Sequence, residues 1–164
     1  MTKILLSFCI PTYNRPERID FFLNQFISTN SNEIELIIGN DNPLCFKTKK
    51  TVEKYNDPRI QYFKNKNNLG LDGNLIKIIH KAKGEYVFIN MDDDDIEMNE
   101  IPWILEIIKN NKNLAQIRGS IGMRKTNEIY GYYGFENKRL KQGIESISEM
   151  AFSFAQELFL KENF

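Results

Sequence analysis

Short apolar runs alternate along the chain with segments whose apolar residues recur at helical spacing. The runs predict buried strands over Leu5 to Ile10, Ile34 to Gly39, Ile60 to Phe63, Tyr86 to Met91 and about Leu114 to Gly119. The periodic segments predict helices from Pro16, over Lys47 to Tyr55, from a cap at Asp72 to a final Gly84, and over about Asn99 to Asn110. This alternation implies right-handed crossovers and a mostly parallel α/β sheet flanked by helices.

The predicted helices carry apolar faces that we expect to pack on this sheet. The face of the first helix consists of Ile19, Phe22, Leu23, Phe26 and Ile27. The face of the third consists of Leu75, Ile76, Ile79, His80 and Ala82, so the single histidine is expected to be a partly buried structural residue. Trp103, at helical spacing from Ile107, is expected in the core.

A further helical stripe is predicted near the C-terminus, from the spacing of Ile144, Ile147, Ala151, Phe154 and Leu158. Phe152, Phe159 and Leu160 lie off this stripe. These extra apolar residues have three interpretations: a peripheral membrane contact, a dimer interface, or the uncovered edge of a longer protein. We favour the last, because no closing element follows them.

Length and charge narrow the class of protein. A chain of 164 residues with 41% hydrophobic residues is expected to fold as one domain with a real core. Lys plus Arg and Asp plus Glu number 22 each, so no net charge favours nucleic acid as a partner. Cys9 and Cys45 lack metal-site spacing and are expected to be reduced thiols in a cytoplasmic protein, and no signal peptide or membrane span is predicted.

Three polar clusters each follow a predicted strand: Pro11 to Asn14, Asn40 to Asn42, and Asp92 to Asp95. The carboxyl ends of parallel strands meet at one edge of a sheet, where α/β proteins bind their ligands. We therefore expect these clusters to gather into one site. Within it, Tyr13 either stacks on a base or plugs the first loop, and Asn68 and Asn74 either bind ligand or serve as turn and cap residues.

Four consecutive aspartates repel one another, and a bound cation would relieve that repulsion. The alternative is a solvated acidic turn that caps the helix at Asn99. The position after a buried strand favours Mg²⁺ or Mn²⁺, which commonly complete their coordination with phosphate oxygens and water. An EF-hand is excluded, because Glu97 or Met98 stands where its glycine belongs, and the chain has no P-loop motif.

Three ordered segments resemble the N-terminal, donor-binding part of the family 2 glycosyltransferases. They are Ser7 to Arg18, Glu35 to Asn42, and Tyr62 to Asp94, and together they span roughly the first hundred residues. The resemblance implies the GT-A fold, a Rossmann-like nucleotide-diphospho-sugar transferase fold. It departs from the family pattern at Asn40, which replaces an acidic residue, and no carboxylate after Asp95 matches the motif of a catalytic base.

The resemblance also implies residue roles. Pro11, Thr12 and Tyr13 would line the base and ribose, and Asn68 would belong to the same sugar-nucleotide site. Asp41 would accept a hydrogen bond from uracil N3, and Asp92 would contact the ribose. The sugar-nucleotide site is therefore expected to consist of Pro11, Thr12, Tyr13, Asp41, Asn68, Asp92 and Asp93, with Asp93 and Asp94 as ligands of Mn²⁺ or Mg²⁺.

The expected function is metal-dependent transfer of a sugar from a nucleotide diphosphate, with UDP-sugars favoured, to a glycan or lipid-linked acceptor, with inversion. The alternative is a donor-binding fragment or degenerate module without turnover. Residues 1–120 would bind the donor, and residues 121–164 would form part of a truncated acceptor side. The expected location is the cytoplasm, in one variant at the inner face of the membrane. A nucleotidyltransferase is disfavoured, because Pro11 to Asn14 replaces its glycine-rich loop.

Overall fold

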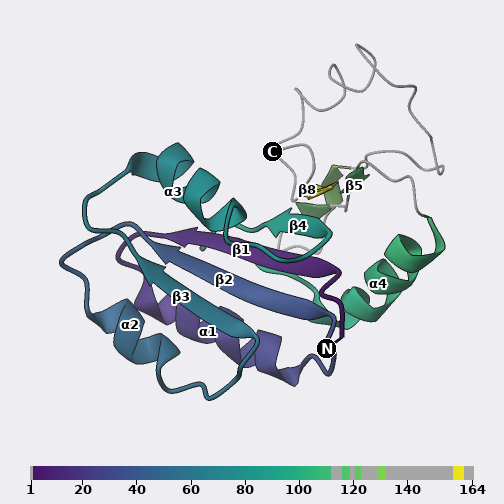
Figure 1. Ribbon diagram of the computed structural model, residues 1–164, viewed down its shortest axis with the longest axis horizontal. Coiled ribbons are helices and arrows are strands. Elements are labelled where there is room, and N and C mark those ends of the chain that lie inside the picture. Colours follow the sequence, from purple (N-terminus) through teal and green to yellow (C-terminus); the bar gives the residue numbers. More distant parts are fainter. Residues whose placement is uncertain (1, 112–115, 119–120, 123–128, 132–156, 161–164) are drawn as a thin grey trace, which may run out of the picture.

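The computed structural model describes residues 2–111, 116–118, 121–122, 129–131 and 157–160. A six-stranded sheet has the order β3-β2-β1-β4-β8-β5 (Figure 1). Its first four strands are parallel: β1 (Leu6–Thr12), β2 (Ile34–Asn40), β3 (Ile60–Lys64) and β4 (Tyr86–Ile89). The other two, β5 (Gln116–Arg118) and β8 (Glu157–Leu160), pair antiparallel, and β8 also pairs antiparallel with β4. A separate antiparallel pair consists of β6 (Ile121–Gly122) and β7 (Ile129–Gly131).

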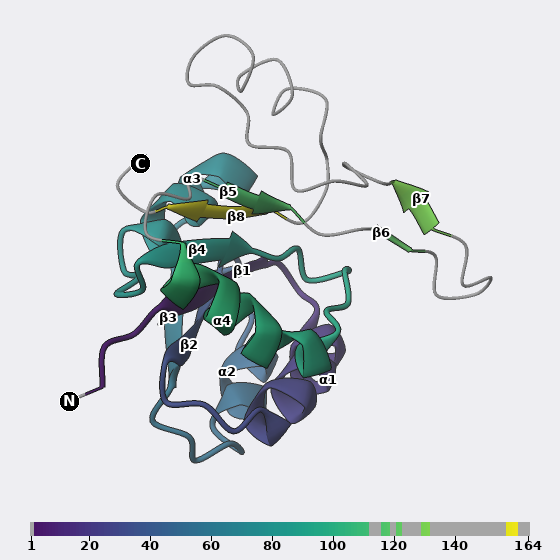
Figure 2. The same cartoon turned by 90° about the vertical axis from the view of Figure 1, so that its right-hand side faces the viewer.

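Helices cover both faces of the parallel strands, which confirms the predicted α/β class (Figure 2). Helices α1 (Pro16–Ser28), α2 (Lys47–Val52) and α4 (Ile101–Asn110) pack on one face, and a short 3₁₀ helix, η1 (Met98–Glu100), leads into α4. Helix α3 (Gly70–Ile79) packs on the other face. The alternation of a strand explains this division, because Phe8 and Ile10 point toward α1 while Cys9 points toward α3.

Helix α1 begins where the sequence predicts. Pro16 occupies its first turn, where a missing backbone N–H costs nothing, and Glu17 faces the positive end of the helix dipole. The predicted face is buried except at Ile27, which is 43% exposed. Phe22 and Phe26 pack their rings against Phe8 of β1, at centroid distances of 6.3 and 6.0 Å.

Helix α3 differs from the prediction at both ends. It begins at Gly70, after the Asn68 side chain accepts a hydrogen bond from the Gly70 N–H, so Asp72 lies in the first turn and is not the cap. It ends at Ile79, and Gly84 has another role: a side chain there would collide with Ser7. The buried positions of α3 are Asn74, Ile78 and Ile79, whereas Ile76 is 56% exposed.

Two other predictions about the core are wrong. Trp103 is 59% exposed, because α4 buries Ile101, Leu105 and Ile108, and position 103 faces away from that side. His80 is exposed, since the chain leaves the helix at this residue. Cys9, which is buried, and Cys45, which is partly buried, form no disulfide in the described part of the chain.

The predicted C-terminal helix is wrong over Glu157 to Leu160, which form β8. Leu158, Phe159 and Leu160 are consecutive apolar residues, which suits a strand, and their pairing satisfies the otherwise open edge of β4. The rest of the predicted stripe, residues 144–156, lies outside the described residues. In the described part of the chain, the helices are too short or too polar to cross a membrane.

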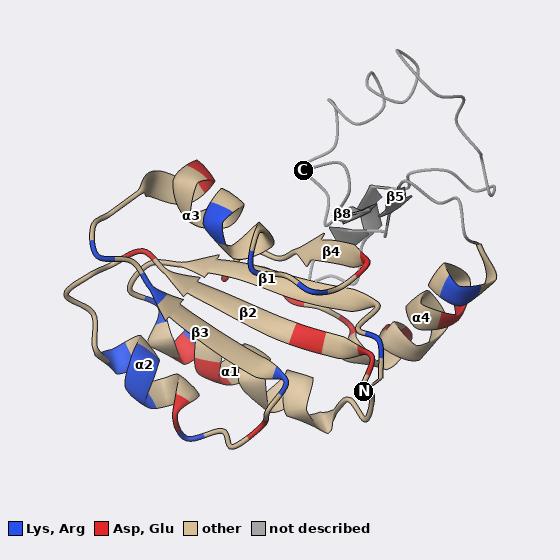
Figure 3. Cartoon of the chain, viewed as in Figure 1, with Lys and Arg blue, Asp and Glu red and all other residues tan. Residues whose placement is uncertain are grey.

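Charged residues lie mainly in helices and loops, and the central strands β1 and β4 carry none (Figure 3). Strand β2 contains one, Glu35, which is 3% exposed. Its carboxylate accepts hydrogen bonds from the Ser7 hydroxyl, the Gln61 amide and the Lys83 N–H. These three donors satisfy a charge that would otherwise be costly to bury.

Gly39, near the carboxyl end of β2, allows α3 to pack closely on the sheet. An added methyl group would lie 2.5 Å from the Ile78 side chain and 2.7 Å from the Asn74 amide oxygen. The Asn74 side chain donates to the Gly39 carbonyl at 2.8 Å. The closeness of α3 to β2 therefore depends on the missing side chain.

We predict that Gly39→Ala lowers the free energy of unfolding by about 1–3 kcal/mol, because overpacking forces α3 away from the sheet. Urea denaturation followed by circular dichroism measures this. The matched control is Gly73→Ala in α3, where the added methyl meets only the Leu69 side chain, at 3.0 Å. Equal stability of Gly39→Ala and wild type would show that α3 is not held by this contact.

Candidate functional site

The strand order reverses between β1 and β4. Strands β2 and β3 follow one another on one side of β1, and β4 lies on its other side. Loops that leave neighbouring strands at such a point separate and form a crevice at the carboxyl edge. The predicted clusters after β1, β2 and β4 all lie at this edge. The expectation that they gather is met.

Thr12 links the three loops. Its backbone carbonyl accepts a hydrogen bond from the Asp41 N–H at 3.0 Å, and its hydroxyl donates to the Asp92 carboxylate at 2.7 Å. The Asn42 side chain donates to the Asn14 side chain at 2.6 Å and joins the first two loops again. Asn14 has a φ of 58°, a left-handed conformation that asparagine tolerates and that turns the chain toward α1.

The Asp41 carboxylate is 4% exposed and is held by amide groups from the loop after β3. Oδ1 accepts hydrogen bonds from the Asn65 side chain and from the Leu69 N–H, each at 2.8 Å. Oδ2 receives only a second, longer contact from the Leu69 N–H, at 3.1 Å. Oδ2 therefore retains more accepting capacity than Oδ1.

A buried amide network fixes the loop that holds Asp41. The Asn65 amide also donates to the Asn74 side chain at 2.9 Å, and its oxygen accepts from the Lys77 ammonium at 2.5 Å. Asn65 and Asn74 are each 2% exposed. Asn74 therefore has a structural role in the fold, and Asn68 forms the turn before α3.

Asn40, where the family pattern often has an acidic residue, is fully buried and uses both ends of its amide. Its nitrogen donates to the Cys45 carbonyl and to the Tyr62 hydroxyl, and its oxygen accepts from the Asn42 N–H. A carboxylate cannot donate these two hydrogen bonds. Asparagine thus closes the turn after β2.

Two arginines at the start of α1 bind the aspartate run after β4 and offset part of its negative charge. One Arg15 nitrogen, Nη1, lies 2.9 Å from Asp92 Oδ1 and 2.9 Å from Asp93 Oδ2. Arg18 donates to the backbone carbonyls of Asp92 and Asp94, at 3.0 and 3.2 Å, and to the Asp95 carboxylate at 2.7 Å. Arg18 therefore fixes the main chain of the run, whereas Arg15 binds its first two carboxylates.

The charges shift the acidities of this cluster in opposite directions. The hydrogen bond from Arg15 lowers the pKa of Asp93 and raises the pKa of Arg15 itself. Partial burial, and then the negative charge of Asp93, raise the pKa of Asp94, although Arg18 opposes this. Asp94 therefore loses its proton less readily than Asp93.

The remaining predicted residues surround this edge without direct contact to the aspartates. Tyr13, in the loop after β1, is 49% exposed, which leaves its ring available for stacking. Pro11 is buried in β1, where it lies opposite Gly39 of β2. Asn68 is exposed in the loop beyond β3, one residue before the Leu69 N–H that binds Asp41.

The side chains available as metal ligands determine how a metal ion would be held. Over the described part of the chain, no three His, Cys, Asp or Glu side chains converge as a metal cluster. The exposed carboxylates of Asp93 and Asp94 suit an Mg²⁺ or Mn²⁺ ion that takes its other ligands from a diphosphate and water. They do not suit an ion held by protein ligands alone.

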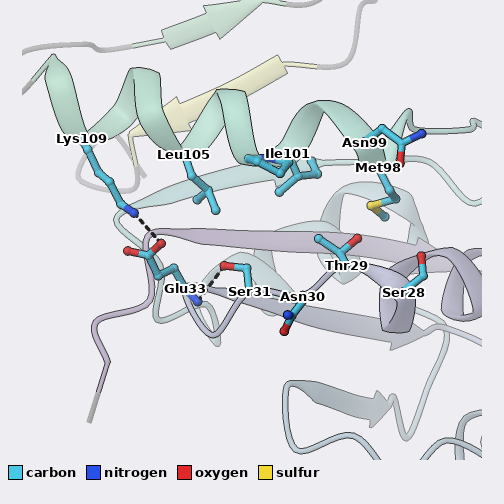
Figure 4. Close-up of a pocket in the computed structure, with 11 residues that line it drawn as sticks. Ser28, Thr29, Asn30, Ser31, Glu33, Met98, Asn99, Ile101, Leu105 and Lys109 are labelled. Atoms are coloured by element: carbon cyan, nitrogen blue, oxygen red, sulfur yellow. Dashed lines mark hydrogen bonds and ion pairs between the residues drawn. The ribbon is translucent and has the colours of Figure 1, made fainter.

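A cavity of about 370 Å³ lies elsewhere, at the amino ends of β1 and β2. It separates the 28–33 segment from η1 and α4, and the ion pair of Glu33 with Lys109, at 2.6 Å, stands at one end (Figure 4). Met98 and Leu105 are among the residues that line it. Because the candidate site lies at the carboxyl ends of the strands, this cavity is not part of it.

Sequence reasoning did not identify Arg15, Arg18, Asn65 or Lys77 as parts of the site. For the arginines a clue exists in the sequence. Two cations separated by one helical turn follow β1, and four carboxylates follow β4, which the structure places beside β1. Asn65 and Lys77 meet through the packing of α3 and leave no comparable pattern in the sequence.

The parallel sheet and its flanking helices define an α/β protein of the GT-A fold. The sequence matches the family described as Glycosyl transferase family 2 over residues 7–160, and the chain belongs to that family. It is 36% identical over 107 residues to the abequosyltransferase RfbV of Salmonella typhimurium, a match that covers 60% of this chain and 31% of that protein.

Two solved structures share the fold. The Staphylococcus aureus protein TarS, residues 1–349, in complex with UDP, aligns with a TM-score of 0.74 at 19% identity, over 96% of this chain and 47% of that one. The mannosyltransferase PcManGT from Pyrobaculum calidifontis, in complex with GDP-Man and Mn²⁺, aligns with a TM-score of 0.59 at 16% identity, over 75% and 37%. The matched region thus spans between a third and a half of these proteins.

We predict that Arg15 lowers the pKa of Asp93 most, whereas Arg18 lowers the pKa of Asp94 and, more weakly than Arg15, that of Asp93. Arg15→Gln should raise the pKa of Asp93, because the carboxylate loses its hydrogen-bonded cation. Arg18→Gln should mainly raise the pKa of Asp94, which Arg18 lowers. A pH titration of carboxyl ¹³C shifts by NMR measures both, and each variant is the control for the other. An unchanged Asp93 pKa in Arg15→Gln would contradict the ion pair.

Proposed function

We propose that this chain binds a nucleotide-diphosphate sugar at the carboxyl edge of β1, β2 and β4 and serves metal-dependent sugar transfer. The single observation that carries this proposal is the junction at Thr12, which ties Asp41 from one neighbouring strand and Asp92 from the other into one crevice. Family membership supports sugar transfer as the reaction class. The UDP and GDP-Man complexes of the two fold relatives support a nucleotide-linked donor.

In this proposal Asp41 recognises the base. Its Oδ2 can accept a hydrogen bond from an N–H such as uracil N3–H, while Oδ1 is occupied by Asn65 and Leu69. Tyr13 and the loop after β1 would lie against the base and ribose, with Asn68 nearby in the loop after β3. A base that presents only a ring-nitrogen acceptor at this position would face the carboxylate with like polarity.

The aspartate run would take the other half of the donor. Asp92 would contact the ribose, and Asp93 with Asp94 would hold Mn²⁺ or Mg²⁺ beside the diphosphate. Such an ion, when bound, stabilises the charge of a nucleoside diphosphate leaving group. Inversion at the sugar carbon would need a base on the acceptor side, and we assign none.

The acceptor in this proposal is a glycan or a lipid-linked glycan, used in the cytoplasm or at the inner face of the membrane. Part of the acceptor side would come from residues 121–164. The second candidate is donor binding without turnover. An assay of sugar transfer and donor hydrolysis separates the two candidates.

We predict that UDP binds much more tightly with Mn²⁺ than with EDTA, because the aspartate run otherwise repels the diphosphate. Isothermal titration calorimetry measures both affinities. Asp93→Asn should abolish most of the metal dependence, and Glu97→Gln, an exposed carboxylate just beyond the run, is the charge-matched control that should retain it. Equal affinity with and without chelator would rule out a metal-bridged donor.

We predict that Asp41→Asn weakens UDP binding roughly tenfold to a hundredfold, equivalent to loss of one charge-assisted hydrogen bond of about 1.5–3 kcal/mol. An asparagine oxygen can still accept from Asn65 and Leu69, while its NH₂ group replaces the Oδ2 acceptor. The variant therefore tests recognition with little change in stability, unlike a truncation to alanine.

The control for this variant is Asp72→Asn, which removes the same charge from an exposed position in the first turn of α3. Its UDP affinity should stay within about twofold of wild type. Thermal melting of both variants verifies that the fold is intact. An Asp41→Asn variant that binds UDP as wild type does would show that Asp41 serves only the loop after β3.

A further inference from the structure

A single nitrogen of Arg15 bridges two carboxylates of the aspartate run. Nη1 stands 2.9 Å from an oxygen of Asp92 and 2.9 Å from an oxygen of Asp93. A cation shared by two carboxylates reduces the repulsion between them, and a divalent ion would do the same with twice the charge. The guanidinium thus supplies the positive charge at the place where the proposed function requires Mn²⁺ or Mg²⁺.

Arg15 and a divalent ion would compete for the Asp93 carboxylate. An Mg²⁺ ion approaches its oxygen ligands to ~2.1 Å, and a guanidinium at hydrogen-bond distance from the same carboxylate would lie within a few ångströms of it. Two cations at that separation repel each other. Arg15 in its present position therefore opposes binding of the ion at Asp93, and release of Arg15 removes that repulsion.

The attachment of Arg15 permits that departure. Arg15 precedes the first turn of α1, and its side chain is 47% exposed. Among the described residues, its ion pairs are with these two carboxylates. Arg18, in contrast, is 28% exposed and donates to two backbone carbonyls, so it remains as a fixed support when Arg15 moves.

We propose that Arg15 is an exchangeable internal counter-ion, which holds Asp92 and Asp93 in the absence of donor and is displaced when a divalent ion binds Asp93. This rests on the proposed function for the identity of the metal-binding edge. Displacement makes the metal alone bind weakly, because each ion must replace an existing ion pair. A diphosphate favours the exchange, since its oxygens coordinate the metal and also accept hydrogen bonds from the released guanidinium fork.

The test measures the affinity of the protein for Mn²⁺ alone, without nucleotide, from the electron paramagnetic resonance signal of free Mn²⁺. Arg15→Gln should bind Mn²⁺ roughly three- to fivefold more tightly than wild type, the range expected for loss of a competing, partly exposed ion pair. The matched control is Arg18→Gln. It removes one positive charge from the first turn of α1 but leaves Asp93 paired with Arg15. Its affinity should change less than twofold, and circular dichroism verifies the fold of both.

A second readout uses UDP. Mn²⁺ should strengthen UDP binding by a smaller factor in Arg15→Gln than in wild type, because the variant no longer gains from release of the guanidinium to the diphosphate. An unchanged or weaker affinity of Arg15→Gln for Mn²⁺ would overturn the proposal, as would an equal increase in Arg18→Gln, which would show a general charge effect. Failure of Mn²⁺ to bind either protein would also overturn it. UDP binding under those conditions would leave donor recognition standing, so the two failures are distinguishable.

Discussion

The repulsion within the aspartate run after β4 is the constraint on which the rest of this edge depends. Four adjacent carboxylates at the end of a buried strand need positive partners, and β4 and its loop provide none. Arg15 and Arg18 supply them from the start of α1, where the helix dipole adds to their effect. The beginning of α1 is therefore fixed against the end of β4, and the chain between β1 and α1 must pass over the crevice.

This constraint also explains why Thr12 is central. The hydroxyl of Thr12 takes the Asp92 oxygen that Arg15 leaves, so the first carboxylate of the run is held from two sides by β1 and its loop. On the other side, the backbone of Thr12 holds the start of the Asp41 turn. Two acidic positions from strands on opposite sides of β1 thus share one rigid support. A nucleotide that spans both would bind a preorganised surface.

The sequence predicted the parallel core and the gathering of the three loops, because strand ends and turn residues are local features. It placed Asp41 and Asp92 at the correct edge for that reason. It did not predict the partners of these residues, since Arg15 and Asp92 are brought together only by the pairing of β1 with β4. Gly84 and Glu157–Leu160 were misassigned for the same reason. The close approach of Gly84 to Ser7, and the pairing of Glu157–Leu160 with β4, both depend on elements far away in the sequence.

The two arginines support different parts of the aspartate run: Arg18 holds its main chain, and Arg15 holds its first two carboxylates. If the cation that stabilises the fold were also the one displaced by ligand, binding would loosen the loop after β4. Arg18 avoids this conflict, because its hydrogen bonds go to backbone carbonyls and to Asp95, outside the proposed ligand set. Under the proposed function, the main chain keeps its support while the carboxylates of Asp92 and Asp93 exchange partners. The separation of these two tasks between residues one helical turn apart makes the first turn of α1 part of the binding edge as well as of the core.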